Sequence, residues 1–403
     1  MVVVVSVDEY RAEIVSLLGT APPVSLPLAD CAGLVLADDV LAGVSLPPFD
    51  NSAMDGYAVR AADVAGASAE SPVELPVGED IPAGRVDVPE LPPGVTHRIM
   101  TGAPMPPGAD SVVMVERTDG GTEKVRINEA PEPGAHIRHV GEDVQKGSVA
   151  LPKGTVLGPA QLGLAAAVGL DRLIVRKPLR VLVVSTGTEL VVPPRPLKFG
   201  QIYESNSITL AAAIRALGCE AEIAMSIDDV GMFRRAIEPR LGEFDLVVTT
   251  GGVSAGAYEV VKDALTGMDV RFQKVAIQPG GPQGNGRWNG IPVVTLPGNP
   301  VSVLVSFEVF LRPALLTALG HSNVDRHRVR ARLTEGLKSP AGRRQFRRGY
   351  YWQREGEVTG EVGPRGGPGS HLLAAFTQAN CLIVLPESVA DVPQGAEVDV
   401  LLF

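Results

Sequence analysis

Cysteine is scarce in this chain: Cys31, Cys219 and Cys381 are the three present among 403 residues. They lie far apart, form no CxxC pair and cannot make an even disulfide framework. This spacing excludes a disulfide-rich secreted scaffold and a zinc ribbon. We therefore expect reduced thiols in or near cores, as in a cytoplasmic protein.

Basic residues are outnumbered by acidic ones, 36 to 46, which gives a net charge of -10. A surface of that sign repels phosphate backbones, so nucleic acid is not expected as a partner. Long hydrophobic runs are also missing. No uninterrupted apolar stretch reaches the roughly 18 residues of a membrane span, and the N-terminus lacks the basic segment of a signal peptide. We expect no membrane partner and a cytoplasmic location.

Glycine and proline are abundant, with 45 and 34 residues, and they separate units of different texture. A chain of this length suggests roughly two to four domains. Residues 1–51 and 139–178 are expected to form a discontinuous linker domain, with a capped helix after Ser6 and another helix beginning at Pro159. Residues 52–138 contain short β-prone pieces between Pro-Gly turns, which indicates a small β-rich domain.

Residues 179–323 alternate apolar strands with helices, the pattern of a parallel α/β sheet covered on both faces. Residues 324–403 return to short strands and turns, which indicates a terminal β-barrel or sandwich. The expected fold class is therefore a multidomain α/β and β protein.

The carboxyl ends of the predicted strands carry glycines, hydroxyls and carboxylates. Glu189 follows the first strand, Asp228 follows the second, and the segment TTGGVSAGAYE, which ends in Glu259, follows the third. Ligands of open parallel sheets gather at this edge, where Gly-rich turns and helix N-termini favour anions. Three carboxylates from different strands would repel one another without a cation, and oxygen ligands beside phosphate suit Mg²⁺. One such loop alone is more simply a turn or a helix cap, but together they predict an anion and magnesium site.

Seven strings follow one another along the chain: NSAMDGYAV (51–59), RIMTGAPMPPGAD (98–110), GAHIRHVGEDV (134–144), VVSTGTEL, TTGGVSAG, LPGNPVS and GRRQFRRG. In this order they resemble the signatures of the molybdopterin molybdenumtransferase family, whose members include the E domain of gephyrin. The resemblance covers essentially the whole chain. Any one string alone is a weak signal, whereas the ordered set is specific.

This resemblance implies an elongated homodimer of four-domain subunits. Family members bind adenylylated molybdopterin and molybdate, release AMP in a Mg²⁺-dependent step and insert molybdenum into the dithiolene. The third domain would share its fold with molybdopterin adenylyltransferases, and such an enzyme is a candidate partner. The cleft would lie between the third domain of one subunit and the second domain of the other.

The resemblance also assigns roles to individual positions. Asp55 and Thr101 would be catalytic residues on the substrate side of the cleft. The other expected catalytic residues, which would also hold the metal ion, are Glu189, Asp228 and Glu259. The expected substrate-binding residues are Gly251, Gly252, Ser254, Lys274, Gln278, Pro297, Pro300, Ser302 and Arg138.

The chain departs from the family pattern at two places. Gln278 and Gly281 stand where two lysines are common, and Glu259 stands where Asp is usual. An amide can still donate hydrogen bonds, but a charge-assisted bond to phosphate or molybdate is roughly twice as strong. The loss of two cations predicts weaker binding of an oxyanion.

Two other functions stay open at this point. An adenylyltransferase that makes the adenylylated pterin would resemble residues 179–323. Those enzymes tend, however, to have GGTG where this chain has GGVS, and they lack the flanking domains. A pterin-binding or scaffold dimer without turnover would fit the absence of the two lysines.

Overall fold

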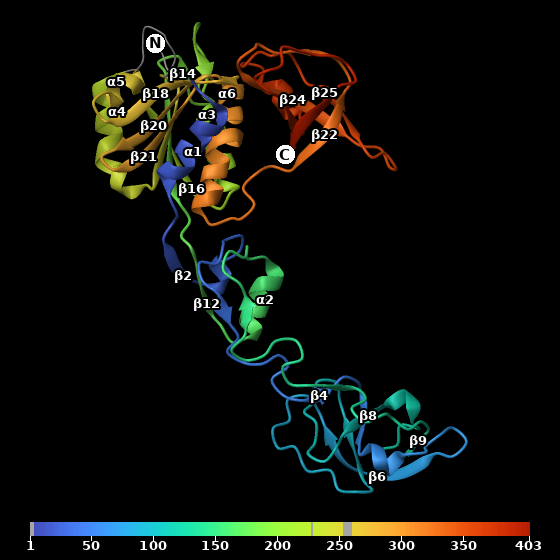
Figure 1. Cartoon of the computed structure of the whole chain (residues 1–403). Coiled ribbons are helices and arrows are strands. Elements are labelled where there is room, and N and C mark those ends of the chain that lie inside the picture. The colour runs from blue at the N-terminus through green and yellow to red at the C-terminus, as the bar shows by residue number, and fades with distance from the viewer. Residues whose placement is uncertain (1–3, 227–228, 253–259) are drawn as a thin grey trace.

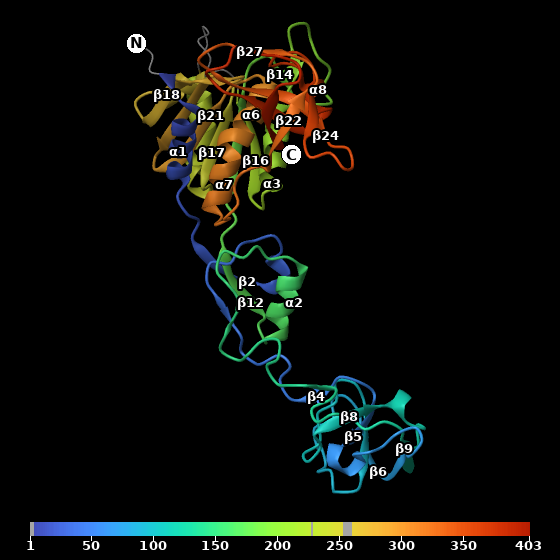
Figure 2. The ribbon, with the colours of Figure 1, turned by 45° about the vertical axis from the view of Figure 1, so that its right-hand side comes forward.

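The computed structural model describes residues 4–226, 229–252 and 260–403. The chain is elongated (Figure 1). An α/β region and a C-terminal barrel lie side by side at one end, a linker region follows, and a β-rich region forms the opposite end. Figure 2 shows the same separation from another side.

The α/β region is built on a seven-stranded sheet. Its strand order is β1 (Val4–Val5), β18 (Asp269–Val275), β20 (Pro282–Trp288), β21 (Ile291–Leu296), β17 (Leu246–Thr250), β13 (Arg180–Thr186) and β16 (Glu220–Ser226). β13 pairs in parallel with β16 and β17, and β17 pairs in parallel with β21. β20 is antiparallel to both of its neighbours. The sheet is therefore mixed, whereas the sequence pattern predicted a parallel sheet.

The sequence pattern misses β20 because this strand has no apolar alternation. Two of its buried side chains are amides, Gln283 and Asn285. Gln283 donates a 2.7 Å hydrogen bond to Ser306 Oγ, and Asn285 donates a 3.0 Å hydrogen bond to a carboxylate oxygen of Glu13. A Cβ added at Gly286 would clash with the neighbouring backbone, at a distance of 1.9 Å. A Gly-rich segment that reads as a turn is thus held in the sheet by polar contacts from distant helices.

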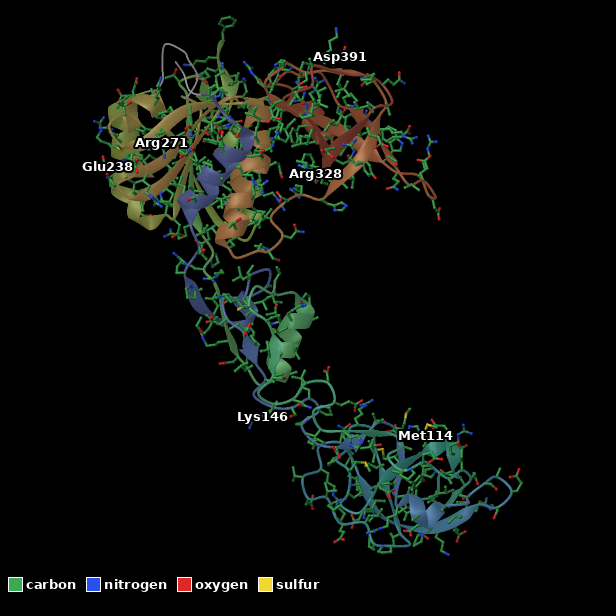
Figure 3. All side chains as sticks on the ribbon, viewed as in Figure 1. Met114, Lys146, Glu238, Arg271, Arg328 and Asp391 are labelled. Carbon is green, nitrogen blue, oxygen red and sulfur yellow. The ribbon has the colours of Figure 1, made fainter. Side chains whose placement is uncertain are left out.

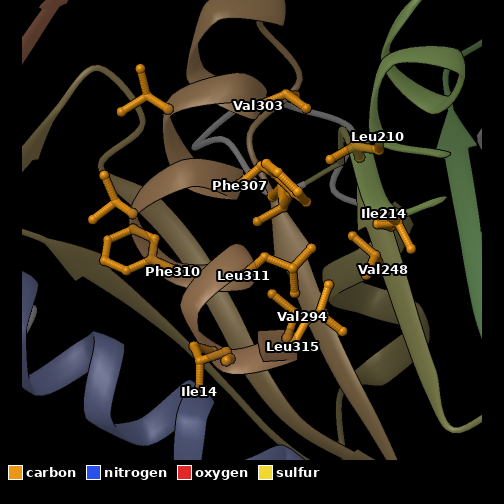
Figure 4. Close-up of a cluster of buried hydrophobic side chains, with 14 of the residues drawn as sticks. Ile14, Leu210, Ile214, Val248, Val294, Val303, Phe307, Phe310, Leu311 and Leu315 are labelled. Carbon is orange, nitrogen blue, oxygen red and sulfur yellow. The ribbon is translucent and has the colours of Figure 1, made fainter. Parts of the chain in front are cut away.

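Helices cover both faces of this sheet. One face carries α1 (Val7–Leu18), α3 (Asn206–Arg215), α6 (Pro300–Ser306) and α7 (Arg312–Ala318), and the other carries α4 (Val230–Ile237), η4 (Glu238–Glu243) and α5 (Val260–Leu265). Successive residues of β13 serve opposite cores: Val183 faces the first group and Leu182 the second. Figure 4 shows the first core, where Ile14, Leu210 and Phe310 converge on the sheet. Burying each side chain of this size contributes about 1.5–3 kcal/mol.

α6 and α7 are joined by a π-helical turn, η5 (Phe307–Leu311), into one long helix. By length and composition, Pro300–Ala318 could cross a membrane. Charged residues, including Glu308 and Arg312, interrupt it, so it is not an unbroken apolar run. In the structure 78% of its apolar window is buried inside the protein, as in the core helix of a globular domain.

The N-terminal helix α1 packs in the α/β region, whereas the sequence analysis assigned it to the linker domain. Its capping box is confirmed: Glu9 N donates to Ser6 Oγ at 3.2 Å, and Ser6 N donates to the Glu9 carboxylate at 3.0 Å. β1 pairs in parallel with β18, and α1 buries Tyr10 and Ile14 in the core of the α/β region. The local sequence predicts this helix but not the surface on which its apolar face packs, because distant residues form that surface.

The linker region combines chain segments from before and after the β-rich region. β2 (Pro23–Pro27) pairs with β12 (Arg172–Arg176), and β3 (Val40–Leu41) with β11 (Val149–Leu151). α2 (Pro159–Ala167), which begins at Pro159 as expected, and η1 (Leu28–Asp30) complete it. α2 packs on these strands through Ala165, in a core that contains Leu36 and Leu157.

The β-rich region is a five-stranded sheet, and the chain enters and leaves it through two neighbouring segments. Its order is β8 (Ser111–Met114), β5 (Gly56–Val59), β7 (Thr96–Ile99), β6 (Val73–Ile81) and β9 (Lys124–Ile127), with η2 (Ala61–Val64) and η3 (Val115–Arg117) beside it. The entering and leaving segments pair as β4 (Asn51–Ser52) and β10 (Ile137–Arg138).

The C-terminal region is a closed five-stranded barrel, which confirms the expected architecture. The order is β24 (Arg344–Trp352), β25 (Gly360–Pro364), β22 (Arg328–Leu333), β28 (Glu397–Leu402) and β26 (Cys381–Leu385), which pairs again with β24. β23 (Leu337–Lys338), β27 (Asp391–Val392) and α8 (Leu373–Thr377) lie in its loops. β19 (Ile277–Gln278) of the α/β region pairs in parallel with β24, so the two regions share a sheet edge.

Candidate active site

A pocket of about 610 Å³ opens at the carboxyl edge of the seven-stranded sheet. β13, β17 and β21 are parallel and end together there, so the turns that follow them form its walls. The described lining residues are Thr186, Gly187, Glu189, Leu190, Ile202, Tyr203, Glu204, Ser205, Asn206, Thr250, Gly251, Gly252, Gly298, Asn299, Pro300 and His371. Glu189, Gly251, Gly252 and Pro300 are residues that the sequence assigns to the site, and this pocket brings them together. We call it the edge pocket.

The turn after β17 is shaped by two glycines with positive φ, 91° at Gly251 and 65° at Gly252. A Cβ on Gly251 would lie 2.8 Å from the carbonyl oxygen of Thr186, so this turn packs directly on the end of β13. The Oγ1 atom of Thr186 is buried without a hydrogen-bond partner in the described part of the chain. Turns without Cβ atoms let a ligand oxyanion approach backbone amides closely.

Glu189 lies exposed at the rim of the edge pocket, where a short arm begins with β14 (Leu190–Val191) and ends with β15 (Ile202–Tyr203), which pairs with β14 in parallel. Gly187 has a φ of 154°, and a Cβ there would lie 2.6 Å from a carboxylate oxygen of Glu189. The carboxylate therefore folds back over Gly187, where glycine alone leaves the required space. Exposed carboxylate oxygens at this edge are suitable ligands for a hard divalent cation.

The start of α3 contributes two lining residues that sequence reasoning missed, Glu204 and Asn206. The buried carboxylate of Glu204 accepts hydrogen bonds from Ser185 Oγ (2.8 Å), Ser207 N (2.8 Å) and Ser207 Oγ (2.5 Å). Asn206 donates a 2.7 Å hydrogen bond to the carbonyl of Gly298, which ties α3 to the turn after β21. The sequence signal for these two residues is the polar run ESNS before a helix, a pattern that is typical of ordinary N-terminal capping.

A second pocket of about 250 Å³ adjoins the edge pocket and shares the turn 298–299 with it. It is lined by Gln278, Pro297 and Ser302, three residues that the sequence assigns to substrate binding. The Oε1 atom of Gln278 accepts a 3.1 Å hydrogen bond from Gln345 of the barrel strand β24. The amide that stands in place of a common lysine is thus engaged by the C-terminal barrel.

A barrel loop, residues 365–372, reaches both pockets. Pro368 and Ser370 line the second pocket, and His371 lines the edge pocket. The loop is joined to the start of α6, because Val301 N donates a 3.0 Å hydrogen bond to the carbonyl of Ser370. Sequence reasoning found none of these loop residues, since their contact with the sheet edge depends on the packing of two separate regions.

Asp55 and Thr101 lie together in the β-rich region. Thr101 N donates a 2.6 Å hydrogen bond to Asp55 Oδ1, and this bond holds the pKa of the Asp55 carboxyl below its ordinary value. Asp55 directly precedes β5, whose first residue Gly56 pairs with Met114. Met114 lies at the opposite end of the molecule from Asp391 of the barrel (Figure 3). Within one chain, this pair and the edge pocket are therefore widely separated.

The chain is similar over nearly its full length to proteins of one family. Molybdopterin molybdenumtransferase 2 of Mycobacterium tuberculosis is 51% identical, over 98% of this chain and 98% of that protein. Molybdopterin molybdenumtransferase of Haemophilus influenzae is 37% identical, over 93% of this chain and 92% of that protein. The crystal structure of the molybdopterin biosynthesis MoeA protein from Pyrococcus horikoshii covers 99% of both chains, with 33% identity and a TM-score of 0.85. The chain belongs to the MoeA family.

Three family descriptions match successive parts of the chain. They are the MoeA N-terminal region (domain I and II) at residues 5–169, the probable molybdopterin binding domain at 182–317 and the MoeA C-terminal region (domain IV) at 330–403. The resemblance inferred from the seven strings is thereby confirmed. The edge pocket lies at the sheet of the probable molybdopterin binding domain.

Three of the predicted site residues, Asp228, Ser254 and Glu259, lie outside the described residues of this MoeA family chain. Of the three predicted metal ligands, Glu189 alone is described. In the described ranges, no group of three or more His, Cys, Asp or Glu side chains is arranged to hold a metal ion.

Two residues predicted to bind substrate line neither pocket. Lys274 is exposed on β18, where it pairs with Val4 of β1. Arg138 is exposed on β10, paired with Asn51 at the junction between the linker and the β-rich region. The positive charge that Lys274 was expected to bring to the pocket is therefore not found there.

Proposed function

We propose that this MoeA family chain is a molybdopterin molybdenumtransferase, which inserts molybdenum from molybdate into adenylylated molybdopterin and releases AMP in a Mg²⁺-dependent reaction. The observation that carries the proposal is the edge pocket, built from three parallel strand ends in a chain that is similar along its whole length to proteins of that name. Open parallel sheets bind phosphorylated ligands at this edge.

The proposed chemistry needs no protein nucleophile. Water, or an oxygen of molybdate, would attack the adenylate phosphorus, while Asn206 and the turn of Gly251 and Gly252 orient the phosphoryl group. The bond from this phosphorus to the oxygen that bridges the two phosphates would break, so that molybdopterin keeps its own phosphate. Attack by water gives AMP directly, whereas attack by molybdate gives an adenylyl-molybdate, from which the dithiolene sulfurs would take the molybdenum as the Mo–O bond to AMP breaks. Glu189, together with Asp228 and Glu259 from the sequence, would hold the Mg²⁺ ion. When bound, that ion would offset charge on the phosphoryl oxygens. The position of Glu189 over Gly187 supports this assignment, because the backbone fixes where the carboxylate lies.

The proposal requires a homodimer in which one protomer completes the site of the other. Asp55 and Thr101 lie at the far end of the same chain from the edge pocket, so they can act there only from a second copy. Exposed apolar side chains occur at both places. Phe199 and Ile202 belong to the arm beside Glu189, and Met54 precedes Asp55. Exposed apolar groups of this kind favour burial in an interface.

The proposed reaction also implies a supplier of substrate. An adenylyltransferase must activate molybdopterin before this step, and a molybdopterin adenylyltransferase is the partner we infer. Both steps would take place in the cytoplasm.

A direct assay tests the function. Purified protein is incubated with adenylylated molybdopterin and molybdate, with and without Mg²⁺, and AMP is measured by chromatography. We expect Mg²⁺-dependent AMP release that is lost in Glu189→Ala and Asp228→Ala. Glu220→Ala, at the opposite end of β16, serves as a matched control with normal release. Absence of AMP release from the unmodified protein, or normal release from both site variants, would overturn the proposal.

A second candidate is a dimer that binds pterin without turnover. It is favoured by Gln278 and Gly281 in place of lysines, and by the engagement of Gln278 with Gln345. The same assay decides between the two, since a scaffold would bind the adenylylated pterin but release no AMP. Gln278→Lys would then show whether a restored charge is enough for turnover.

A further inference from the structure

The two adjoining pockets contain little positive charge. The edge pocket has two carboxylates among its described lining residues, Glu189 and Glu204. Across the described linings of both pockets no lysine or arginine occurs, and His371 is the one side chain that can carry a positive charge. A pocket of this composition would repel molybdate and phosphate unless another group attracted them.

His371 lies exposed at the rim of the edge pocket, on a loop whose backbone is anchored to the barrel. Its imidazole lies against Gly369, where an added Cβ would be 2.9 Å from the ring Cε1 atom. Gly369 itself is anchored, because the guanidinium of Arg348 donates a 3.2 Å hydrogen bond to its carbonyl and another hydrogen bond to the carbonyl of Gly367. Arg348 is 4% exposed, so the anchor belongs to the barrel core. The barrel thereby presents one imidazole to the sheet edge of the neighbouring region.

We propose that His371 binds the tetrahedral oxyanion of the substrate, either molybdate or the adenylate phosphate, and takes the place of the charge missing at Gln278 and Gly281. The proposal rests on the proposed function and adds a specific anion ligand from the C-terminal barrel. An imidazolium donates charge-assisted hydrogen bonds, which are stronger than those of a neutral amide. Ser370, the neighbouring residue, lines the second pocket, so this loop would contact a bound substrate in both pockets.

The test compares His371→Ala, His371→Gln and His371→Lys in the full-length protein. Because a charge-assisted hydrogen bond is lost, we expect His371→Ala to raise KM for molybdate or for adenylylated molybdopterin roughly tenfold or more, with kcat within about twofold. His371→Lys should restore KM, whereas His371→Gln should restore it only partly. His327→Ala is the matched control, since His327 also lies in the C-terminal region but lines neither pocket.

Calorimetric titration with molybdate alone and with AMP alone separates the two oxyanions and needs no turnover. Weaker binding of one of them by His371→Ala identifies the group that His371 binds. Unchanged binding of both, no binding of either to the unmodified protein, or equal losses in His371→Ala and His371→Lys would each overturn the proposal. If the unmodified protein binds an oxyanion but releases no AMP, the proposed reaction fails while the role of His371 is still decided.

Discussion

The backbone amide of Thr101 donates a 2.6 Å hydrogen bond to a carboxylate oxygen of Asp55, at the end of the molecule remote from Glu189. If the active site combines both ends, it must be shared between protomers. Asp55→Ala and Glu189→Ala should each be inactive alone. When the two variants are co-expressed, half of the dimers should be mixed and each should hold one intact site, so about a quarter of the normal AMP release should return.

Subunit composition is verified by tagging the two variants differently. A pair of Glu189→Ala and Gly187→Ala, both altered in the same pocket, is the control that should not recover. Equal failure of both pairs would argue against a site shared between protomers.

Gly187→Ala should disturb the site without unfolding the protein. The new Cβ would lie 2.6 Å from a carboxylate oxygen of Glu189, so the carboxylate must move. We expect AMP release to fall by about tenfold or more, because misplacement of a catalytic group by about 1 Å is costly. Gly163→Ala, within α2 and with nothing within 4 Å of its added Cβ, should leave activity unchanged and stabilise the helix by about 0.5–1 kcal/mol.

Glu204→Gln should destabilise the pocket wall. The carboxylate of Glu204 accepts three hydrogen bonds, from Ser185 Oγ and from the backbone and hydroxyl of Ser207, and the amide would present a donor to at least one of them. One mismatched buried group costs about 1–3 kcal/mol, which thermal unfolding would detect. Glu220→Gln, at an exposed position on β16, should shift the unfolding temperature little. Equal shifts in both variants would contradict this assignment.

Arg348→Met should loosen the barrel loop. The methionine keeps the apolar part of the side chain but leaves the carbonyls of Gly367 and Gly369 without their donor. Amide hydrogen exchange in residues 366–372 should become faster, and KM should rise more than kcat falls. Arg343→Met, at an exposed position three residues after Pro340, should change neither quantity.

The ion pair between Asp8 and Arg344 predicts a pH dependence of stability. Arg344 donates two 2.8 Å hydrogen bonds to the Asp8 carboxylate, and these bonds lower the pKa of Asp8 in the folded protein. The unfolded chain binds a proton to Asp8 more readily, so the pair stabilises the protein above the ordinary pKa. Its contribution is lost as the pH falls through the lowered value.

Asp8→Asn should therefore reduce the unfolding free energy at neutral pH, by at most about 1 kcal/mol because Asp8 is largely exposed. The difference from the unmodified protein should shrink as the pH is lowered below 4. Exposed Asp30→Asn is the control. A difference that grows on acidification would contradict the assignment.

Local sequence signals predicted much of the secondary structure. Ser6 and Glu9 cap α1, and Pro159 begins α2, because these residues act within one turn of a helix. Val181 to Val184 read as a buried strand because both faces of the sheet are covered, and β13 forms there. These features depend on neighbours only a few residues apart.

The parts that the sequence did not reveal depend on residues far apart in the chain. β20 exists because Glu13 and Ser306 satisfy the amides of Asn285 and Gln283. The sequence pattern of this segment does not reveal such hydrogen-bonding partners, since polar residues and glycines ordinarily indicate a turn. For the same reason the sequence predicts Glu189 as a residue of the edge pocket but does not predict His371.

The sequence by itself determined the family of this chain and the β-barrel and α/β character of its parts, because ordered motifs and apolar periodicity are local properties. Tertiary structure alone decided that α1 joins the α/β core, that Lys274 lies outside the pockets and that Asp55 lies at the far end of the molecule from Glu189. Burial and hydrogen bonding between distant segments set these positions, and their free energies are defined only once the chain has folded.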